Sequence, residues 1–348
     1  MAINKRIIRS NDEAAAGASF NTVVYSGNAS TNPITSVGFQ PDFVWIKCRT
    51  VSGESHWLTD SVRGAQKSLS SNQSIAEQNV TNGLVSFDPD GFTVGSYTAF
   101  NSTSGGADNM VAWCWKAGGA AVTNTAGLIT SQVSANVGAG FSIVSYTGNG
   151  GDNQTVGHGL GNTPSIVITK NRNKSGGLDG NWAFGFMPNS SGAYLNLDAA
   201  FDTGRFIGFF GSGTNSNTFT VSTGGTFGHT NENGDPIIAY CFAEVAGFSK
   251  FGSYTGAVGK TIDFGFEPAF VMIKKYDTAY NWNMYDNKRG ASALDDRYML
   301  LANASNAEFT SSTVQIDFTS NGISFPNSYD GTNQTGGQYI YMAFANQF

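Results

Sequence analysis

Charged residues are scarce in this chain of 348 residues. Lys, Arg, Asp and Glu together make up 13% of it, and the formal net charge is −6 at pH 7. The few cations are dispersed, whereas proteins that bind nucleic acid present Lys and Arg clustered on one face. We therefore expect no nucleic-acid partner.

Long apolar runs and paired cysteines are also lacking. No stretch approaches the roughly 20 apolar residues that a membrane-spanning helix needs, and the first residues form no apolar leader. We therefore expect no membrane partner and synthesis in a cytoplasm. The three cysteines, Cys48, Cys114 and Cys241, lie within or at the end of apolar runs. Their number and spacing suit neither a disulfide scaffold nor a zinc site, so we expect buried free thiols.

Glycine and aromatic residues, by contrast, are abundant. The chain holds 44 Gly, 26 Phe, 13 Tyr and 6 Trp. Gly, Asn, Ser and Thr are typical of turns, while aromatic and β-branched runs are typical of strands. This combination predicts an all-β protein with enough apolar surface for well-packed cores.

Four landmarks recur three times in the same order. They are a Y-[ST]-G tripeptide at Tyr25, Tyr146 and Tyr254; a P-x-x-V-x-[IT]-K strand ending at Lys47, Lys170 and Lys274; a tryptophan at Trp57, Trp182 and Trp282; and an apolar run starting at Val111, Ile238 and Ile340. A pattern of this kind indicates three copies of one unit of about 100 residues, long enough for each copy to bury a core.

The repeats predict three tandem β-sandwiches of jelly-roll or lectin-like type. We assign residues 1–20 to an N-terminal arm, 21–119 to repeat 1, 120–140 to a linker with one added strand, 141–247 to repeat 2 and 248–348 to repeat 3. Asp-Gly, Gly-Gly and Asn-Gly dipeptides predict hairpins within 86–95, 219–228 and 316–325. Short helical turns are expected only at 74–80 and 291–300.

No motif predicts catalysis, a cofactor or a metal. The three histidines occupy unrelated places in the repeat, and none has a second ligand at helical spacing. Asp88 and Asp90 could bind calcium, but the dipeptide Asp90-Gly91 is itself a sufficient hairpin former. We therefore expect a protein that is not an enzyme.

Several residues are candidates for contacts with a partner or a glycan. A D-x-x-R-G motif occurs at Asp60–Arg63 and again at Asp286–Arg289, and it most simply ties down a loop through an ion pair. Trp57, Trp182 and Trp282 could stack on sugars, although their spacing equally suits core aromatics. The lysine that ends each repeated strand could shield a sheet edge or contact a neighbour. Lys5, Arg6 and Arg9 could form an arm that docks on another protein.

The repeated residues resemble a known domain. FQPDFVWIKCR, DSVRG, SFDPDGFTVGS and VAWCWKAGG in repeat 1, and TPSIVITKNR with the later NW in repeat 2, are similar to a repeat domain of virion-associated proteins of tailed bacteriophages, especially marine and cyanobacterial ones. The resemblance covers about residues 20–348, and repeat 3 departs from it most. It implies a structural or tail-fibre-like role and offers no catalytic residue to carry over.

The resemblance leads to three expectations for function. The first is a structural protein exposed on a phage particle, in a tail fibre or another host-attachment component, with tail, collar or capsid proteins as partners. The alternatives are a head or collar decoration protein, and a lectin-like module that binds host surface glycan. A glycan depolymerase would need paired carboxylates on a long groove, for which the sequence gives no sign. We expect a homo-oligomer, by preference a trimer, although three tandem repeats could form a pseudo-trimer from one chain.

Overall fold

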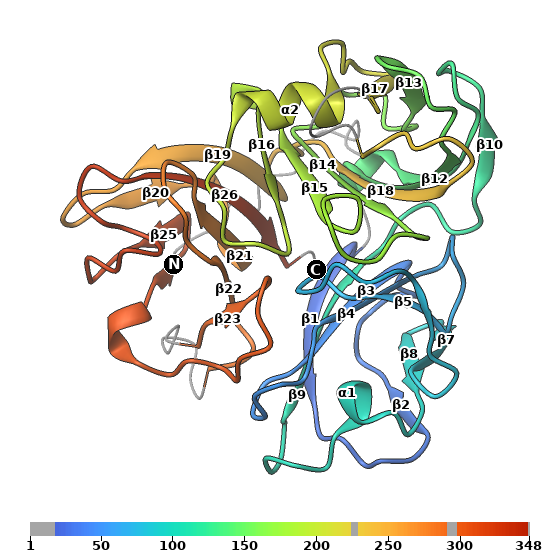
Figure 1. Cartoon of the computed structure of the whole chain (residues 1–348). Helices are drawn as coiled ribbons and strands as arrows, with labels where there is room; N and C mark the ends of the chain where they lie inside the picture. Colours follow the sequence, from blue (N-terminus) through green and yellow to red (C-terminus); the bar gives the residue numbers. More distant parts are fainter. Residues whose placement is uncertain (1–17, 224–228, 291–297, 347–348) are drawn as a thin grey trace, which may run out of the picture.

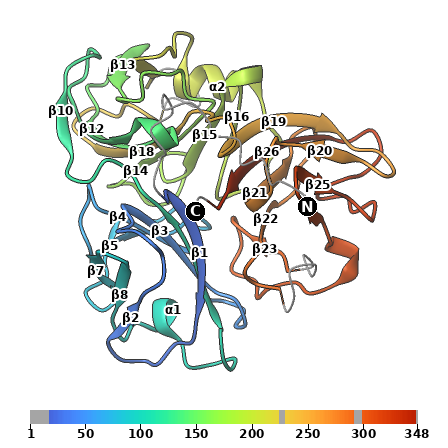
Figure 2. The ribbon, with the colours of Figure 1, turned by 180° about the vertical axis from the view of Figure 1, so that it is seen from behind.

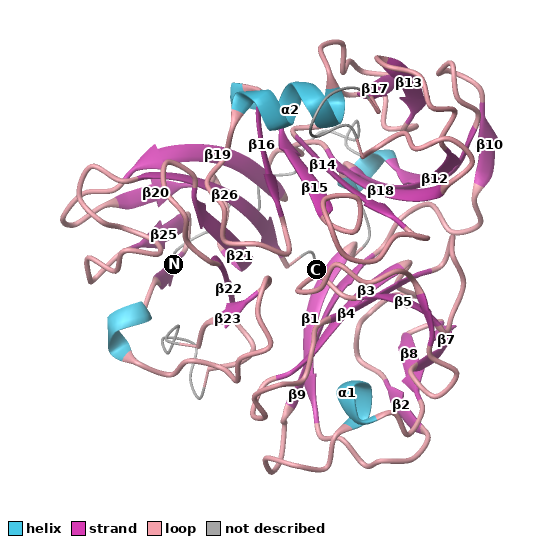
Figure 3. Cartoon of the chain, viewed as in Figure 1, coloured by secondary structure: helices cyan, strands magenta, loops and turns pink. Residues whose placement is uncertain are grey.

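The computed structural model describes residues 18–223, 229–290 and 298–346, and it is built almost entirely of antiparallel strands (Figures 1 and 3). The predicted all-β class is confirmed. Three lobes, one for each repeat, meet at the centre of the molecule, and the view from behind shows the same three lobes (Figure 2).

Repeat 1 is a sandwich of two sheets. The large sheet has the order β1-β9-β3-β4-β5-β6, and the small sheet has the order β2-β8-β7. The bounds are β1 Phe20–Tyr25, β2 Asn32–Ile34, β3 Phe43–Cys48, β4 Trp57–Asp60, β5 Lys67–Leu69, β6 Gln78–Asn79, β7 Leu84–Asp88, β8 Gly91–Val94, α1 Thr98–Asn101 and β9 Met110–Trp115.

Repeat 2 has the same arrangement with two strands added at one edge. Its large sheet has the order β10-β11-β12-β18-β14-β15-β16, and β13 pairs with β17. The bounds are β10 Val122–Asn124, β11 Ser131–Asn136, β12 Phe141–Thr147, β13 Gln154–Gly157, β14 Ile166–Asn171, β15 Trp182–Phe186, β16 Ser191–Tyr194, α2 Thr203–Phe210, β17 Thr218–Val221 and β18 Pro236–Phe242.

Repeat 3 repeats the plan again. The orders are β19-β26-β21-β22-β23 and β20-β25-β24. The bounds are β19 Ser249–Thr255, β20 Thr261–Asp263, β21 Pro268–Lys275, β22 Trp282–Asp286, β23 Leu300–Leu301, β24 Asp317–Thr319, β25 Gly322–Ser324 and β26 Gln338–Ala345. In every repeat the first strand pairs with the last, and the last pairs with the P-x-x-V-x-[IT]-K strand.

Strand register shows which residues are equivalent. Lys47 lies opposite Val111, Lys170 opposite Ile238 and Lys274 opposite Ile340, so three of the four sequence landmarks superimpose. The tryptophan landmark does not. Lys170 and Lys274 face Trp182 and Trp282, but in repeat 1 Trp57 faces Ile46, one residue earlier. Because neighbouring strand residues point to opposite faces, His56 stands where the other repeats have tryptophan, and Trp57 points into its own sandwich.

Each large sheet is buried on both faces, which explains the nearly continuous apolar runs. In β3, Phe43 and Trp45 join a core shared by all three repeats, whereas Val44, Ile46 and Cys48 join the core of repeat 1 alone. In repeat 2, Ile166 and Ile168 of β14 face the shared core and Val167 faces the private one. In repeats 1 and 2, alternate residues thus supply two different cores, whereas in repeat 3 the residues of both faces, such as Val271 and Met272, belong to the one shared cluster.

Three equivalent aromatic residues meet at the centre of the shared core. Trp115, Phe242 and Phe344, which lie near the ends of the last strands β9, β18 and β26, have ring centroids 5.7 to 6.5 Å apart. Each comes from a different repeat. The three large sheets are therefore arranged around one axis as a trimer would be, but within a single chain.

Other sequence expectations can now be compared with the fold. Residues 120–140 are not a separate linker, because β10 and β11 extend the large sheet of repeat 2. The hairpins within 86–95 and 316–325 are present as β7–β8 and β24–β25. In 219–228, however, β17 pairs with β13, and residues 224–228 lie outside the described residues.

Helix α2 is not predicted from the sequence, because Gly204 and Gly208 lower its helix propensity, although Asp202 caps it. Residues 74–80 hold no helix, and 291–297 lie outside the described residues.

Candidate functional site

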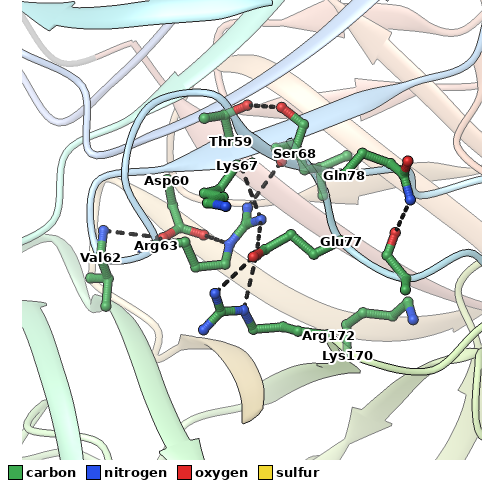
Figure 4. Close-up of polar contacts among 12 residues, drawn as sticks. Thr59, Asp60, Val62, Arg63, Lys67, Ser68, Glu77, Gln78, Lys170 and Arg172 are labelled. Atoms are coloured by element: carbon green, nitrogen blue, oxygen red, sulfur yellow. Dashed lines mark hydrogen bonds and ion pairs between the residues drawn. The ribbon is translucent and has the colours of Figure 1, made fainter. Parts of the chain in front are cut away.

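The D-x-x-R-G motif of repeat 1 lies at the contact with repeat 2, here called junction 1–2 (Figure 4). Arg63 Nε donates to Asp60 Oδ2 at 2.5 Å, and Arg63 Nη1 donates to Glu77 at 3.1 Å. From repeat 2, Arg172 Nη2 donates to Glu77 at 2.8 Å and the Tyr240 hydroxyl donates to Asp60 at 2.7 Å. Two acidic and two basic groups thus form one neutral network across the junction.

Burial makes this network costly to disturb. The side chains of Asp60 and Arg63 are fully buried, and that of Glu77 is 12% exposed. Burial alone would raise the pKa of Glu77, but hydrogen bonds and positive charge from Arg172 and Arg63 hold that pKa below its ordinary value. Removing one cation would leave a carboxylate buried without its partner.

Junction 3–1, where repeat 3 meets repeat 1, has the same network. Arg289 Nε donates to Asp286 at 2.6 Å and Arg289 Nη1 donates to Glu308 at 2.8 Å. From repeat 1, Arg49 Nη2 donates to Glu308 at 2.8 Å and Trp113 Nε1 donates to Asp286 at 2.9 Å. Arg49 and Arg172 each follow their landmark lysine by two residues, so the two junctions use equivalent positions.

Junction 2–3 keeps the backbone contact and changes the side chains. Glu77 N–H donates to the Arg172 carbonyl at 2.8 Å, and Glu308 N–H donates to the Arg49 carbonyl at 2.6 Å. At the third junction, Phe201 N–H donates to the Tyr276 carbonyl at 2.9 Å.

The side chains at that third contact are aromatic. The Phe201 and Tyr276 ring centroids lie 6.3 Å apart, and those of Phe201 and Trp282 lie 5.7 Å apart. Register places Phe186 at the position of the two motif aspartates, and Asn189 three residues later at the position of the arginines. At junction 2–3, the positions of the motif aspartate, the motif arginine and the arginine of the neighbouring repeat therefore all hold uncharged residues.

A second set of contacts joins each repeat to its neighbour, so that the three repeats form a closed ring. Trp182 Nε1 of repeat 2 donates to the Ser70 carbonyl of repeat 1 at 2.8 Å, and Trp282 Nε1 of repeat 3 donates to the Tyr194 carbonyl of repeat 2 at 3.2 Å. At the equivalent place in repeat 1, burial lowers the pKa of His56, and Ser71 Oγ of repeat 1 donates to the Ala302 carbonyl of repeat 3 at 2.6 Å. Each repeat is thus covered by the one before it, and repeat 1 is covered by repeat 3.

The landmark lysines are buried beside these junctions. Each Nζ donates to the carbonyl of the following residue, Cys48, Asn171 or Lys275, at 2.5 to 2.8 Å. Lys274 also donates to the Asp198 carbonyl of repeat 2. Burial lowers the pKa of Lys47 to about 8 and the pKa values of Lys170 and Lys274 to about 7. The expectation that these lysines shield a sheet edge is wrong, because their strands lie inside the sheets.

The sequence-predicted contact residues are all buried, and all of them except Trp57 lie at these junctions. They are Trp57, Asp60, Arg63, Trp182, Trp282, Asp286 and Arg289. The expected Asp–Arg ion pair is present in both motifs, with Nε on one carboxylate oxygen and backbone N–H groups on the other. Of the three candidate sugar-stacking residues, Trp182 and Trp282 lie in the shared core, and only Trp57 borders a surface hollow. Lys5, Arg6 and Arg9 lie outside the described residues.

Each repeat contains a buried hydrogen bond of its landmark tyrosine that the sequence analysis does not predict. The landmark tyrosine hydroxyls of Tyr25 and Tyr146 each donate at 2.6 Å to the carbonyls of Phe100 and Thr230, and Tyr254 donates to that of Thr332. The asparagine that follows each carbonyl is buried and accepts a backbone N–H from the turn after the tyrosine; these are Asn101, Asn231 and Asn333. An asparagine 76 to 85 residues after each tyrosine was the available signal.

Side chains that could ligate a cation meet at one place among the described residues. Asp179, His229 and Glu232 bring their ligand atoms within 4.8 Å of one another, and His229 Nδ1 lies 2.8 Å from Asp179. The mutual hydrogen bond accounts for this contact without an ion, and the expected absence of a metal stays a prediction. Asp88 accepts from Thr93 within its own hairpin, and Asp90 accepts from the backbone of Ser36 and Gly38 and so ties the β7–β8 turn to the β2–β3 loop.

The three repeats fall within one family. The model of a family described as a domain of unknown function (DUF7483) matches residues 15–347, and the chain belongs to that family. The match covers the whole ring as a single unit. No curated protein and no solved structure matches the chain. In the described part of the chain, no helix is both long and apolar enough to cross a membrane.

Proposed function

We propose that this protein is a structural component exposed on a tailed-bacteriophage particle, in a tail fibre or another tail-associated host-attachment part. The observation that supports this best is the closed ring, in which one chain packs three β-sandwiches around a shared core. Such a body is rigid and presents three sets of loops outward, as a spacer or an attachment module requires. The sequence resemblance to virion repeat domains points to the same class of protein.

The role we propose is not enzymatic. The motif carboxylates, Asp60 and Asp286, are each buried against an arginine. His56 and His158 are buried too, and burial lowers the pKa of each imidazole. These groups hold the structure together, which supports binding or assembly over glycan cleavage.

The threefold arrangement also bears on the oligomer. The contacts that would hold a trimer of chains are made here between repeats of one chain, at all three junctions. We therefore propose that the trimer expected from the sequence is replaced by a pseudo-trimer. Sedimentation equilibrium would then give the chain mass of 36.7 kDa, whereas three times that mass would favour a trimer of chains.

The position in the particle can be tested with antibodies raised against the purified chain. Gold-labelled antibody on the tail or its fibres would support the proposal. Label on the head or collar would favour the alternative of a decoration protein. Particles that carry neither the label nor peptides of this chain by mass spectrometry would contradict both.

A further inference from the structure

Repeat 1 has a surface groove that the other repeats lack the residues to form. Two adjoining hollows of about 310 and 370 Å³ lie beside the edge strand β6 and the start of α1. Trp57, Gln78 and Tyr97 line both of them. Asn79 and Asn82 line the first hollow, and Gln73 lines the second.

The indole of Trp57 has an unusual position for its polar atom. The side chain is 6% exposed, and among the described residues Nε1 has no hydrogen-bond partner. Trp45, Trp113, Trp182 and Trp282 all donate their Nε1–H groups to protein acceptors. Trp115 does not, but it lies in the shared apolar core. The N–H group is buried by protein atoms, so the ring of Trp57 borders the groove while its donor does not reach it.

Tyr97 gives the groove an exposed aromatic face. Its side chain is 43% exposed, and its ring meets that of Trp57 edge to face with centroids 6.1 Å apart. Trp57 in turn packs against Phe100, which holds the pair in place. An aromatic face beside amide groups suits a ligand with an apolar ring face and hydroxyl groups on its rim.

The charge of the lining narrows the class of ligand. No cation lines the two hollows, and Glu54 is the one charged residue among the lining residues. Phosphates and acidic sugars would therefore meet no positive partner there. We propose that this groove binds a neutral saccharide, with Tyr97 stacking on a sugar ring and the side-chain amides of Asn79 and Asn82 hydrogen-bonding its hydroxyl groups.

The other repeats provide an internal comparison. Register places Ala183 and Asn283 at the position of Trp57. Neither residue can supply an indole, so one saccharide site per chain is expected. The inference deepens the attachment role and rests on it for biological meaning, but binding in solution is measured independently of where the protein lies in a particle.

Saturation-transfer NMR can test the site with the methyl glycosides of glucose, galactose, mannose and N-acetylglucosamine. We expect transfer to at least one of them. Tyr97→Ala should weaken binding about tenfold, and Asn82→Ala, which removes one amide of the lining, about threefold. Phe309→Ala, at an exposed aromatic residue of repeat 3, is the matched control and should leave binding unchanged.

Two results would overturn the site. One is the absence of transfer to all four glycosides by the folded wild-type chain. The other is transfer that neither Tyr97→Ala nor Asn82→Ala weakens, with folding of both variants verified by thermal melting. Either result would leave the particle location, measured by antibody labelling, untouched.

Discussion

Junctions 1–2 and 2–3 join equivalent surfaces of neighbouring repeats with different kinds of side chain. Both share an equivalent backbone hydrogen bond, from Glu77 to Arg172 in the first and from Phe201 to Tyr276 in the second. Around it, the first buries a neutral network of charges, and the second packs aromatic rings. Buried ion pairs and apolar packing can be of similar stability, but a single substitution is far more damaging to the charged version. The comparison shows that several positions of a junction differ together when its side chains are aromatic instead of charged.

The largest expected effect comes from breaking the charged network at its centre. Arg63→Met leaves Asp60 and Glu77 buried with one cation fewer, and should lower the free energy of unfolding by about 3–5 kcal/mol. Asn189→Met, at the equivalent exposed position of junction 2–3, should change it by less than about 0.5 kcal/mol. Urea denaturation of both variants measures the difference. Equal losses would show that the two junctions do not differ as described.

Introducing a Glu–Arg pair into junction 2–3 tests whether its positions are equivalent to those of Glu77 and Arg172 in junction 1–2. Phe201→Glu alone should cost about 2–3 kcal/mol, because it removes ring packing against Trp282 and places a charge there. Adding Tyr276→Arg should recover about 1–2 kcal/mol, since it restores the pair found at the other junctions. A double-mutant cycle in urea gives the coupling. Strictly additive losses would contradict the equivalence of these positions.

The buried lysines make stability depend on pH. Their pKa values are lowered in the folded protein, so between about pH 7 and the unfolded value near 10.5 the unfolded chain binds more protons, and stability rises with pH. Lys170→Met should reduce that rise by about 1 kcal/mol between pH 7 and 8. The matched variant Lys47→Met should reduce it about one pH unit higher, because the pKa of Lys47 is about 8. Unfolding midpoints across pH 6–9 that are parallel in wild type and variants would refute this.

The smallest effect concerns contacts within each repeat, which the junctions should not influence. Tyr25→Phe and Tyr146→Phe each remove one buried hydroxyl from a carbonyl acceptor and should cost about 1 kcal/mol apiece. Similar losses are expected although repeats 1 and 2 meet different neighbours. Thermal melting compares the two variants. A loss of stability in only one of them would show that the two tyrosine hydrogen bonds are not equivalent.

Much of the fold could be predicted from the sequence, because strand periodicity and turn residues are local signals. The Tyr, Lys and apolar-run landmarks all superimpose in register. Trp57 misled the alignment, since a shift of one residue moves a side chain to the other face of a sheet, and spacing alone does not detect this. For residues 120–140 the small and polar residues predict a linker with one added strand, whereas the structure has two strands there, β10 and β11, because β11 pairs with β12 and β10 pairs with β11.

The candidate site was predicted only in part, because its contacts join distant segments. The ion pair between Asp60 and Arg63 is local and was expected. Its partners Glu77 and Arg172 belong to different repeats, and no spacing rule connects them. The burial of Lys170 was likewise missed, because a lysine at the end of an apolar strand is usually exposed.

The chain closes on itself, with repeat 3 contacting repeat 1. This closure is tested by a double-mutant cycle on Arg49 and Glu308, which are 259 residues apart in sequence and 2.8 Å apart at junction 3–1. With Arg49→Met, Glu308→Gln and the double variant, measured by urea denaturation of the monomeric chain, we predict a coupling of about 1–3 kcal/mol. A coupling indistinguishable from zero would contradict the closed ring.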